Sequence, residues 1–267
     1  MPESAEWSYS VIMNPVFLMD HIFLCFKKLF GGKSRETFTP HQHAVMFALF
    51  AKNILDIFGE KKGDLLLLSA VTQYGKERGR RMAKRCIAHN KPLNMDSYLA
   101  FSEWRYAQDF EKTALFDKPY CAYRIYRCPW NVSWEKSDLK KYGKYYCRAI
   151  DHAILSGFNP DLSLEMPSYL SQEGGRYCEF HWKDLIVDDA QIARTKLITD
   201  EIKESCIKDF IFHTAHLFST LEKCILQLDL PKGAKAVRQT RKAFIKKCSY
   251  QEWLQVLAIK NSDFNAI

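Results

Sequence analysis

Four side chains between residues 128 and 178 have the chemistry of nucleophiles and proton carriers. Cys147 and Asp151 lie four positions apart in a segment predicted to be helical, so both would project from one helix face. In such a pair the thiol could be a nucleophile and the carboxylate its base. Alternatively, one of the two groups could be a base and the other could orient the substrate. Cys128 and Cys178 lie in two strand-like segments, and pairing of these strands would bring all three thiols to one cavity. The predicted catalytic group is therefore Cys147, Asp151, Cys128 and Cys178, and ordinary core packing is the alternative for each cysteine.

A second group of side chains could bind a carboxylated substrate. Arginine binds a carboxylate through two parallel hydrogen bonds, and surface salt bridges are the alternative role for such residues. The histidines in this group are three positions apart on one predicted helix, where they could line a pocket or bind a metal as a pair. No matching Glu-x-x-His motif accompanies them, so we expect a pocket or an ordinary polar helix face. The predicted substrate-binding residues are Glu77, Arg78, Arg105, Trp130, Asn159, His213 and His216.

The spacing of the cysteines argues against a metal site. The three candidate thiols are separated by 19 and 31 positions, whereas zinc sites usually contain a close Cys-x-x-Cys pair. The sequence also has no glycine-rich phosphate loop, no G-x-S-x-G elbow and no His-Glu-x-x-His motif. We therefore expect no metal and no cofactor, and the sequence gives no support to nucleotide hydrolysis, serine-esterase or metalloprotease chemistry.

Hydrophobic periodicity places these residues on a mainly helical framework. Apolar positions at helical spacing predict long helices, and Gly75 and Gly79 in the second of them indicate close approach of another element. Cys178, Phe180 and Trp182 alternate with polar residues and would share one face of a strand. This order of elements predicts an α+β fold that is predominantly helical with a small antiparallel sheet. The expected helices are 39–59, 62–89, 136–156, 192–227 and 234–257, the expected strands are 120–128 and 176–183, and 98–110 is either their partner strand or a helix.

Length and composition predict one domain over residues 1–267. The chain is 47% hydrophobic and 26% charged, which excludes disordered and low-complexity classes. The net charge is +8, but no nucleic-acid recognition motif accompanies it, so we expect no nucleic-acid partner. Nine cysteines, an odd number, favour a reduced cytoplasmic protein over a disulfide framework. Within the domain we expect an amphipathic helical segment at 1–35, a helical part at 36–92, a cysteine-rich sheet part at 98–184 and C-terminal helices at 190–260.

The apolar segment at residues 10–30 is the part of the chain that could serve as a targeting or membrane element. Polar residues interrupt it, and no basic segment precedes it, so neither a spanning helix nor a signal peptide is predicted. An amphipathic helix packed on the body is expected, with peripheral membrane contact through Lys27 and Lys28 as the alternative. The sequence leaves a homo-oligomer open.

Several motifs together resemble one family, the L-2-amino-thiazoline-4-carboxylic acid hydrolases. The resemblance is densest over residues 120–180 and continues more weakly into residues 77–79 and the segment with His213 and His216. It implies opening of a thiazoline ring by water, which gives a carbamoyl-cysteine type product. The motifs are Cys128-Pro129-Trp130, Tyr146-Cys147, Asp151, Gly157-Phe158-Asn159-Pro160, Gly174 and Cys178-x-Phe180.

The implied reaction assigns roles to the candidate residues. A carbon in a C=N bond next to sulfur is electrophilic and needs a nucleophile, a proton donor for the leaving atom and a cation for the substrate carboxylate. We expect Cys147 to attack, or to hold a polarised substrate, while Asp151 transfers protons and Cys128 and Cys178 shape the pocket or serve as alternative nucleophiles. A nucleophilic Cys147 should be partly exposed and have a lowered pKa. The carboxylate would pair with Arg78, Arg80 or Arg105.

The leading hypothesis is a cytoplasmic hydrolase acting on a small carboxylated ring or amide. The alternative is a small-molecule binding or sensor domain whose cysteines and aromatic residues line a cavity without turnover. The sequence contains no recognisable DNA-binding or signalling domain, which favours the enzyme. A third class, a basic interaction protein that uses residues 232–247, is disfavoured because apolar residues within that segment indicate a docked helix.

Overall fold

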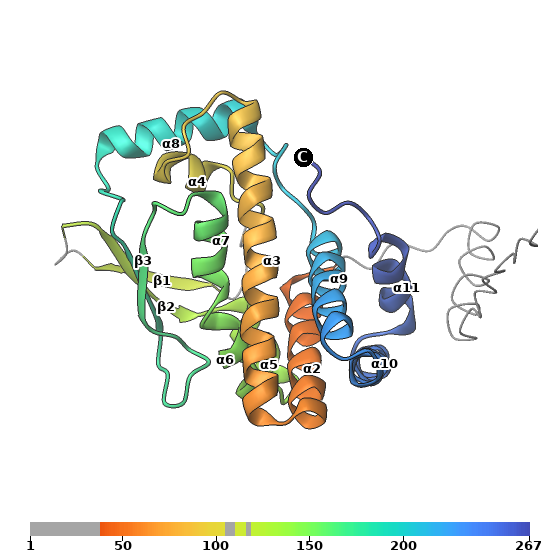
Figure 1. Ribbon diagram of the computed structural model, residues 1–267. Helices are drawn as coiled ribbons and strands as arrows, with labels where there is room; N and C mark the ends of the chain where they lie inside the picture. The colour runs from red at the N-terminus through yellow and green to blue at the C-terminus, as the bar shows by residue number, and fades with distance from the viewer. Residues whose placement is uncertain (1–37, 105–109, 116–118) are drawn as a thin grey trace, which may run out of the picture. The chain divides into compact units, whose positions relative to one another are not determined.

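Helix α2 (Pro40–Phe58) begins and ends at the residues that its sequence predicts. The Thr39 side chain accepts a hydrogen bond from the His41 N–H, and the Gln42 side chain accepts one from the Thr39 N–H, which together satisfy free donors of the first turn. Gly59 ends the helix with a φ of 80°, a conformation that favours glycine. The structure is a computed structural model that describes residues 38–104, 110–115 and 119–267 (Figure 1).

The second helix, α3 (Glu60–Ala88), follows directly after Gly59 and is the longest of the described elements. The strands after it come in two adjacent pairs between runs of helices, and all of their pairings are antiparallel, which confirms the predicted α+β class. In chain order they are α4 (Met95–Ala100), β1 (Glu111–Leu115), β2 (Cys121–Arg127), α5 (Pro129–Lys136), α6 (Lys140–Cys147), α7 (Ile150–Phe158), β3 (Leu164–Ser168), β4 (Cys178–Trp182), α8 (Asp189–Ile202), α9 (Phe210–Leu228), α10 (Leu230–Lys247) and α11 (Tyr250–Ile259).

The four strands form one antiparallel sheet in the order β1-β2-β4-β3. Tyr123 of β2 lies opposite Phe180 of β4, and Ile125 lies opposite Cys178. Because side chains alternate along a strand, this register places Cys178, Phe180 and Trp182 on one face, as predicted. All three side chains are buried, so this face points into the protein.

Helix α7 lies between the sheet and α3, and α2 and α9 lie beyond α3 (Figure 1). One hydrophobic cluster fills the space between α2, α3 and α9, and a smaller one joins Leu155 of α7 to the inner face of the sheet. Tyr98 and Cys128 pack against both clusters. The two hydrophobic clusters therefore meet near α4 and the end of β2, which carry Tyr98 and Cys128.

Three predicted long helices are wrong because each is divided in two. The segment 136–156 breaks between α6 and α7 at Arg148 and Ala149. The segment 192–227 breaks between α8 and α9, where the Asp209 side chain accepts from the Phe212 N–H and starts α9. The segment 234–257 breaks at Ser249, which caps α11 in the same way. At the second and third breaks a polar side chain caps the next helix and so competes with a continuing helix, which apolar periodicity alone does not predict. The first break has no such cap, because Ala149 precedes α7.

Two further differences concern the sheet. Strand β2 pairs with β1 and with β4. The segment 98–110, a candidate partner, instead begins in helix α4, which the Asn94 side chain caps by accepting from the Ser97 N–H. Strand β3 was not predicted. It lies at the sheet edge, where Pro167 is tolerated because a residue without a backbone N–H does not interrupt pairing there. The single domain over 1–267 stays a prediction, because the helix expected at 1–35 lies outside the described residues.

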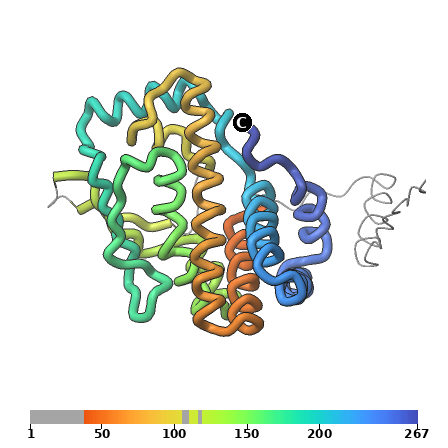
Figure 2. The backbone as a smooth tube through the Cα atoms, viewed as in Figure 1, coloured from red at the N-terminus to blue at the C-terminus, as the bar shows by residue number. Residues whose placement is uncertain are grey.

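Glycine allows α3 and α7 to approach closely, as the sequence predicts. A Cβ atom at Gly79 would lie 2.0 Å from the Ile154 carbonyl oxygen and 2.6 Å from the Phe158 nitrogen. The tube in Figure 2 shows the two helices running side by side. This contact sets the distance between Arg78 on α3 and Asp151 on α7.

We expect Gly79→Ala to destabilise the protein by about 1–3 kcal/mol or more, since both clashing atoms belong to backbone that cannot move independently. Urea denaturation followed by circular dichroism measures this change. The matched control is Arg80→Ala at the next, exposed position of α3. Equal stability of the Gly79→Ala variant and the control would contradict the tight helix contact.

Candidate functional site

The structure brings the four predicted catalytic side chains into one neighbourhood. Cys128 precedes α5, Cys147 ends α6, Asp151 lies in the first turn of α7 and Cys178 begins β4. The negative charge of Asp151 contributes to the raised pKa of each of the three thiols, and Cys128 and Cys147 both lie within the electrostatic range of Cys178. We call these residues the Cys–Asp cluster.

The pairing of Cys147 with Asp151 does not arise from a shared helix face. The two residues lie on either side of the break between α6 and α7. They are brought together because α7 turns back against α3 after this break, which only the tertiary packing determines.

Three members of the cluster are half-buried rather than sealed. Cys128, Cys147 and Asp151 keep accessible surface, although burial is the main cause of the raised pKa of each one. Protein therefore surrounds these residues on most sides, and part of the surface of each residue stays accessible.

The thiols are protonated at neutral pH, which corrects the expected low pKa of Cys147. Burial raises the pKa of Cys128 to about 11 although the backbone N–H groups of Trp130 and Asn131 act in the opposite direction. Burial raises the pKa of Cys178 to about 12, and its sulfur accepts a hydrogen bond of 3.3 Å from the Leu170 N–H. The pKa of Cys147 is raised well above its ordinary value, first by burial. A nucleophilic thiol in this cluster therefore needs a base to remove its proton.

Asp151 is suited to be that base. Burial raises the pKa of its carboxyl group to about 6, and the positive charge of Arg78 limits the rise. Among the described residues, no side chain or backbone N–H donates a hydrogen bond to this carboxylate. A carboxyl group with a pKa near the working pH can both accept and return a proton.

Arg78 is the arginine that faces the interior. Its side chain is 2% exposed, and its guanidinium lies 3.6 Å from the centre of the Trp104 ring and 3.4 Å from the Glu103 carboxylate. Its charge acts on the pKa of Asp151, Tyr146 and His213. Arg80 is exposed and cannot take this role, and Arg105 lies outside the described residues.

Arg78 belongs to a buried network of charged side chains around Glu103. Glu103 also forms ion pairs with Arg81 at 2.6 Å and with Arg85 at 3.0 Å, so three buried guanidinium groups contact this carboxylate. An arginine held in place in this way can bind a planar carboxylate through two parallel hydrogen bonds.

Glu77 and His216 form a pair with each other and not with the cluster. The Glu77 carboxylate accepts hydrogen bonds from His216 Nε2 at 2.8 Å and from Thr220 at 2.7 Å. These hydrogen bonds outweigh burial and lower the pKa of Glu77 to about 2, while burial lowers the pKa of His216 to about 4. The pair joins α3 to α9, so Glu77 cannot be part of a clamp for a substrate.

His213 has a different environment from His216. Its side chain is completely buried, its ring centre lies 4.7 Å from that of Trp104, and neither ring nitrogen has a hydrogen-bond partner among the described residues. Burial and the charges of Arg78 and Arg81 lower its pKa well below the ordinary value, so the ring is neutral. Buried polar atoms without partners are rare in proteins, and they often mark places where water or a ligand binds.

A chain of hydrogen bonds fixes Trp130 and was not expected from the sequence. Trp130 Nε1 donates to His43 Nδ1 at 2.9 Å, and His43 Nε2 lies 3.0 Å from the Tyr74 hydroxyl. Tyr74 in turn donates to the His213 carbonyl oxygen at 3.4 Å. Because an indole N–H can only donate, His43 must carry its proton on Nε2. A histidine within the apolar run of α2 was the signal that could have revealed this network.

Asn159 is occupied by local structure. Its amide donates to the Leu93 carbonyl oxygen at 2.8 Å, and its own carbonyl oxygen accepts from the Asp161 N–H at 2.9 Å. Both ends of the side chain are therefore engaged in closing the turn after α7, and the structure does not bring Asn159 into the cluster.

A separate surface recess of about 320 Å³ lies at the start of α3 and contains none of the predicted site residues. Its charged groups largely pair with one another: Arg148 contacts Asp64 at 2.5 Å, and Tyr145 donates to Glu60. Within the described ranges, no group of three histidine, cysteine or acidic side chains is placed to hold a metal ion. None of the helices that the structure describes is long and apolar enough to cross a membrane.

Comparison with known proteins gives one match. The family model for L-2-amino-thiazoline-4-carboxylic acid hydrolase matches residues 40–182. No curated protein matches the chain, and no solved structure does. The matched range contains the whole Cys–Asp cluster and Arg78, whereas His213 and His216 lie after its end.

Proposed function

We propose, because the chain belongs to the L-2-amino-thiazoline-4-carboxylic acid hydrolase family, that it opens a small carboxylated thiazoline ring or a related cyclic amidine or amide. In this proposal Arg78 binds the substrate carboxylate, Asp151 transfers protons and Cys147 is the nucleophile. The observation that carries it is the unpartnered Asp151 carboxyl group, with a pKa of about 6, among three neutral thiols and close to Arg78. Trp130 and His213 would form part of the surrounding wall.

The proposed reaction adds one water molecule in two steps. Asp151 removes the Cys147 proton as the sulfur attacks the C=N carbon, and the electron pair of the C=N bond moves onto nitrogen. The pair returns as the ring C–S bond breaks, and the departing sulfur takes the proton from Asp151. Water then attacks the same carbon and gives a proton to Asp151, and the Cys147 sulfur leaves and recovers that proton.

Turnover of L-2-amino-thiazoline-4-carboxylate tests this function. We expect the wild-type protein to release one new thiol for each substrate molecule, measured with a colorimetric thiol reagent and by mass spectrometry. Cys147→Ser should lower kcat by about 10³-fold or more, because the hydroxyl is a much weaker nucleophile at this pH. Cys224→Ser, in α9 outside the cluster, is the matched control. If all three cluster cysteines can be replaced without loss, water attacks directly and the role of the thiol is refuted.

Replacing Arg78 tests how the substrate carboxylate is bound. Arg78→Lys keeps the charge but loses the bidentate geometry, so we expect kcat/KM to fall by about 10- to 100-fold, mainly through a higher KM. Arg80→Lys on the exposed side of α3 should behave as the wild type. A substrate analogue without the carboxylate should remove the difference between the Arg78→Lys variant and the wild type. A persistent difference would show that Arg78 acts on something other than the carboxylate.

The raised pKa values of the thiols favour one alternative, a binding or sensor domain. Neutral, buried thiols are unreactive in the absence of a base. A ligand that binds in calorimetry with no thiol release and no change in mass would favour this alternative.

A further inference from the structure

Helix α10 carries almost the whole net charge of the protein. Its 18 residues include seven lysines and arginines and no acidic residue, which gives a formal charge of +7, whereas the whole chain has +8. The remainder of the chain is therefore close to neutral. Charge that is concentrated on one element in this way produces a positive potential over one region of the surface.

Four of these cations form a line along the exposed side of α10. They are spaced three, four and four positions apart, so they are neighbours on one helix face. The buried residues of the helix have the same spacing two positions earlier, and two positions correspond to a rotation of about 200°. The line therefore points away from the body of the protein and is about 16 Å long. The exposed line, which we call the basic ridge, consists of Lys235, Arg238, Lys242 and Lys246, and the buried line consists of Gly233, Ala236, Thr240 and Phe244.

The basic ridge has no counter-charge within the described residues. None of its four side chains forms an ion pair or a hydrogen bond in the part of the chain that the structure describes. The acidic side chains near the two ends of α10 are engaged elsewhere. Asp229 accepts from the Lys232 N–H at 3.0 Å, and Glu252 accepts from the Gln42 amide at 2.6 Å. The ridge is therefore open to an anionic partner.

The opposite face of α10 anchors the helix, so the ridge exists before any partner binds. Ala236 and Phe244 are completely buried, and Thr240 accepts a hydrogen bond of 3.1 Å from Asn53 of α2. Helix α10 also packs against α9 and α11 (Figure 1). Cations that are already arranged on a fixed helix lose less conformational entropy when they bind than cations on a disordered segment.

We propose that the basic ridge binds this protein reversibly to the surface of a membrane that contains anionic phospholipid. A straight line of cations on one helix face fits a flat layer of phosphate headgroups, and helices with four to eight such residues are typical of this binding. Leu228 and Leu230, at the turn that begins α10, are 49% and 65% exposed. Apolar side chains next to a basic helix gain from entering the headgroup layer, whereas the phosphate backbone of a nucleic acid gives them no apolar surroundings. This inference is independent of the proposed hydrolase function.

Vesicle flotation with the full chain tests the proposal. We expect the wild type to bind vesicles of phosphatidylcholine and phosphatidylglycerol but not vesicles of phosphatidylcholine alone. Binding should weaken when the salt concentration rises from about 0.1 M to about 1 M, because the screening length falls from about 10 Å to about 3 Å. Replacing all four cations of the ridge should lower the partition coefficient by about 100- to 1000-fold, since each contributes about fivefold. The substitutions are Lys235→Gln, Arg238→Gln, Lys242→Gln and Lys246→Gln.

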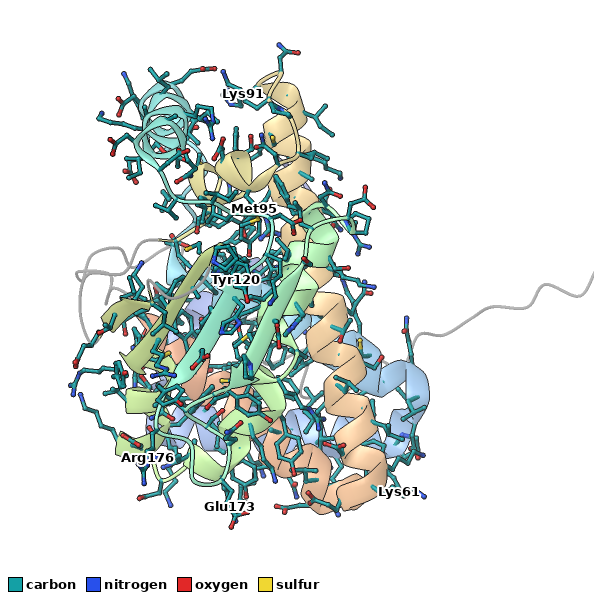
Figure 3. All side chains as sticks on the ribbon, turned by 90° about the vertical axis from the view of Figure 1, so that its left-hand side faces the viewer. Lys61, Lys91, Met95, Tyr120, Glu173 and Arg176 are labelled. Atoms are coloured by element: carbon teal, nitrogen blue, oxygen red, sulfur yellow. The ribbon has the colours of Figure 1, made fainter. Side chains whose placement is uncertain are left out.

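A matched control removes the same total charge from scattered exposed positions. These lie on α3, on β1, in the loop before β4 and directly after α8, and the control should bind as the wild type does. The sheet and α10 lie on opposite sides of α3 in Figure 1, and Figure 3 shows the labelled Arg176 beside the lower end of the sheet. The control substitutions are Arg80→Gln, Lys112→Gln, Arg176→Gln and Lys203→Gln.

A second variant keeps the charge of the ridge and changes its side chains. Lys235→Arg, Lys242→Arg and Lys246→Arg together should leave vesicle binding within about threefold of the wild type, because the attraction depends on charge. Melting temperatures of all variants show whether the fold is intact. Loss of binding in the arginine variant with an unchanged melting temperature contradicts the electrostatic basis of the proposal.

Three further results overturn the proposal. The first is a wild type that does not bind anionic vesicles at low salt. The second is an equal loss of binding in the ridge variant and the scattered control, which would make net charge, and not the ridge, responsible. The third is tighter binding to a mixed-sequence oligonucleotide than to anionic vesicles, with the loss again confined to the ridge variant. That result would assign the ridge to a nucleic acid.

Discussion

Asp151→Asn is expected to lower kcat by about 10²- to 10⁴-fold, because an amide can neither accept nor return the proton that each step transfers. In the wild type, activity should rise as the pH passes through about 6, where Asp151 ionises and becomes able to act as a base. A pH–rate profile from pH 4.5 to 8.5 measures this rise, and the rise should be absent from the variant. Asp161→Asn, at an exposed position shortly after α7, is the matched control.

The same substitution should stabilise the protein at alkaline pH. The pKa of Asp151 is raised from 3.8 to about 6 by folding, so the folded state binds more protons than the unfolded state between these values. The contribution of Asp151 to the free energy of unfolding is therefore greatest when the pH lies below the pKa of its carboxyl group in the unfolded state. It falls as the pH rises through the pKa in the folded state. We expect the free energy of unfolding of the Asp151→Asn variant to exceed that of the wild type by about 3 kcal/mol at most at pH 8, and by less at pH 5. Urea denaturation at the two pH values measures this, and a variant less stable than the wild type at pH 8 would contradict the burial of an unpaired carboxylate.

Glu103→Gln is expected to have the largest effect on folding. The substitution removes the negative charge of the carboxylate that Arg78, Arg81 and Arg85 share, so all three buried guanidinium groups lose an ion pair. Breaking a buried ion pair in this way typically costs about 3–5 kcal/mol, a large part of the stability of a domain. Thermal and urea denaturation measure the loss, and Glu111→Gln at an exposed position of β1 is the control.

The pH dependence of Glu103 has the opposite sign to that of Asp151. Burial alone would raise the pKa of Glu103, but the charges and hydrogen bonds of its arginine partners lower it below the ordinary value. Its contribution to stability is therefore present above the unfolded pKa and is lost as the pH falls through the folded pKa. As the pH is lowered, the free energy of unfolding of the Glu103→Gln variant should fall less than that of the wild type. A variant that is as stable as the wild type at pH 7 would refute the shared ion-pair arrangement.

Features that depend on neighbouring residues could be predicted from the sequence alone. Thr39 and Gly59 bound α2 as expected, because capping and a positive φ are local properties. The alternation of Cys178, Phe180 and Trp182 placed them on one buried face, because side chains alternate along every strand. The fold class and the family follow from such patterns repeated along the chain.

Which candidate groups are available for chemistry depends on how distant segments pack together. Arg78 is buried while Arg80 is exposed, and Asn159 is engaged in a turn, because distant elements cover or contact some side chains and leave others open. The pKa of Cys147 is raised where a reactive thiol suggested a lowered one, because burial by several helices and the sheet outweighs any local effect. The role of His43 depends on Trp130, a partner 87 positions away, and sequence spacing carries no information about such a contact.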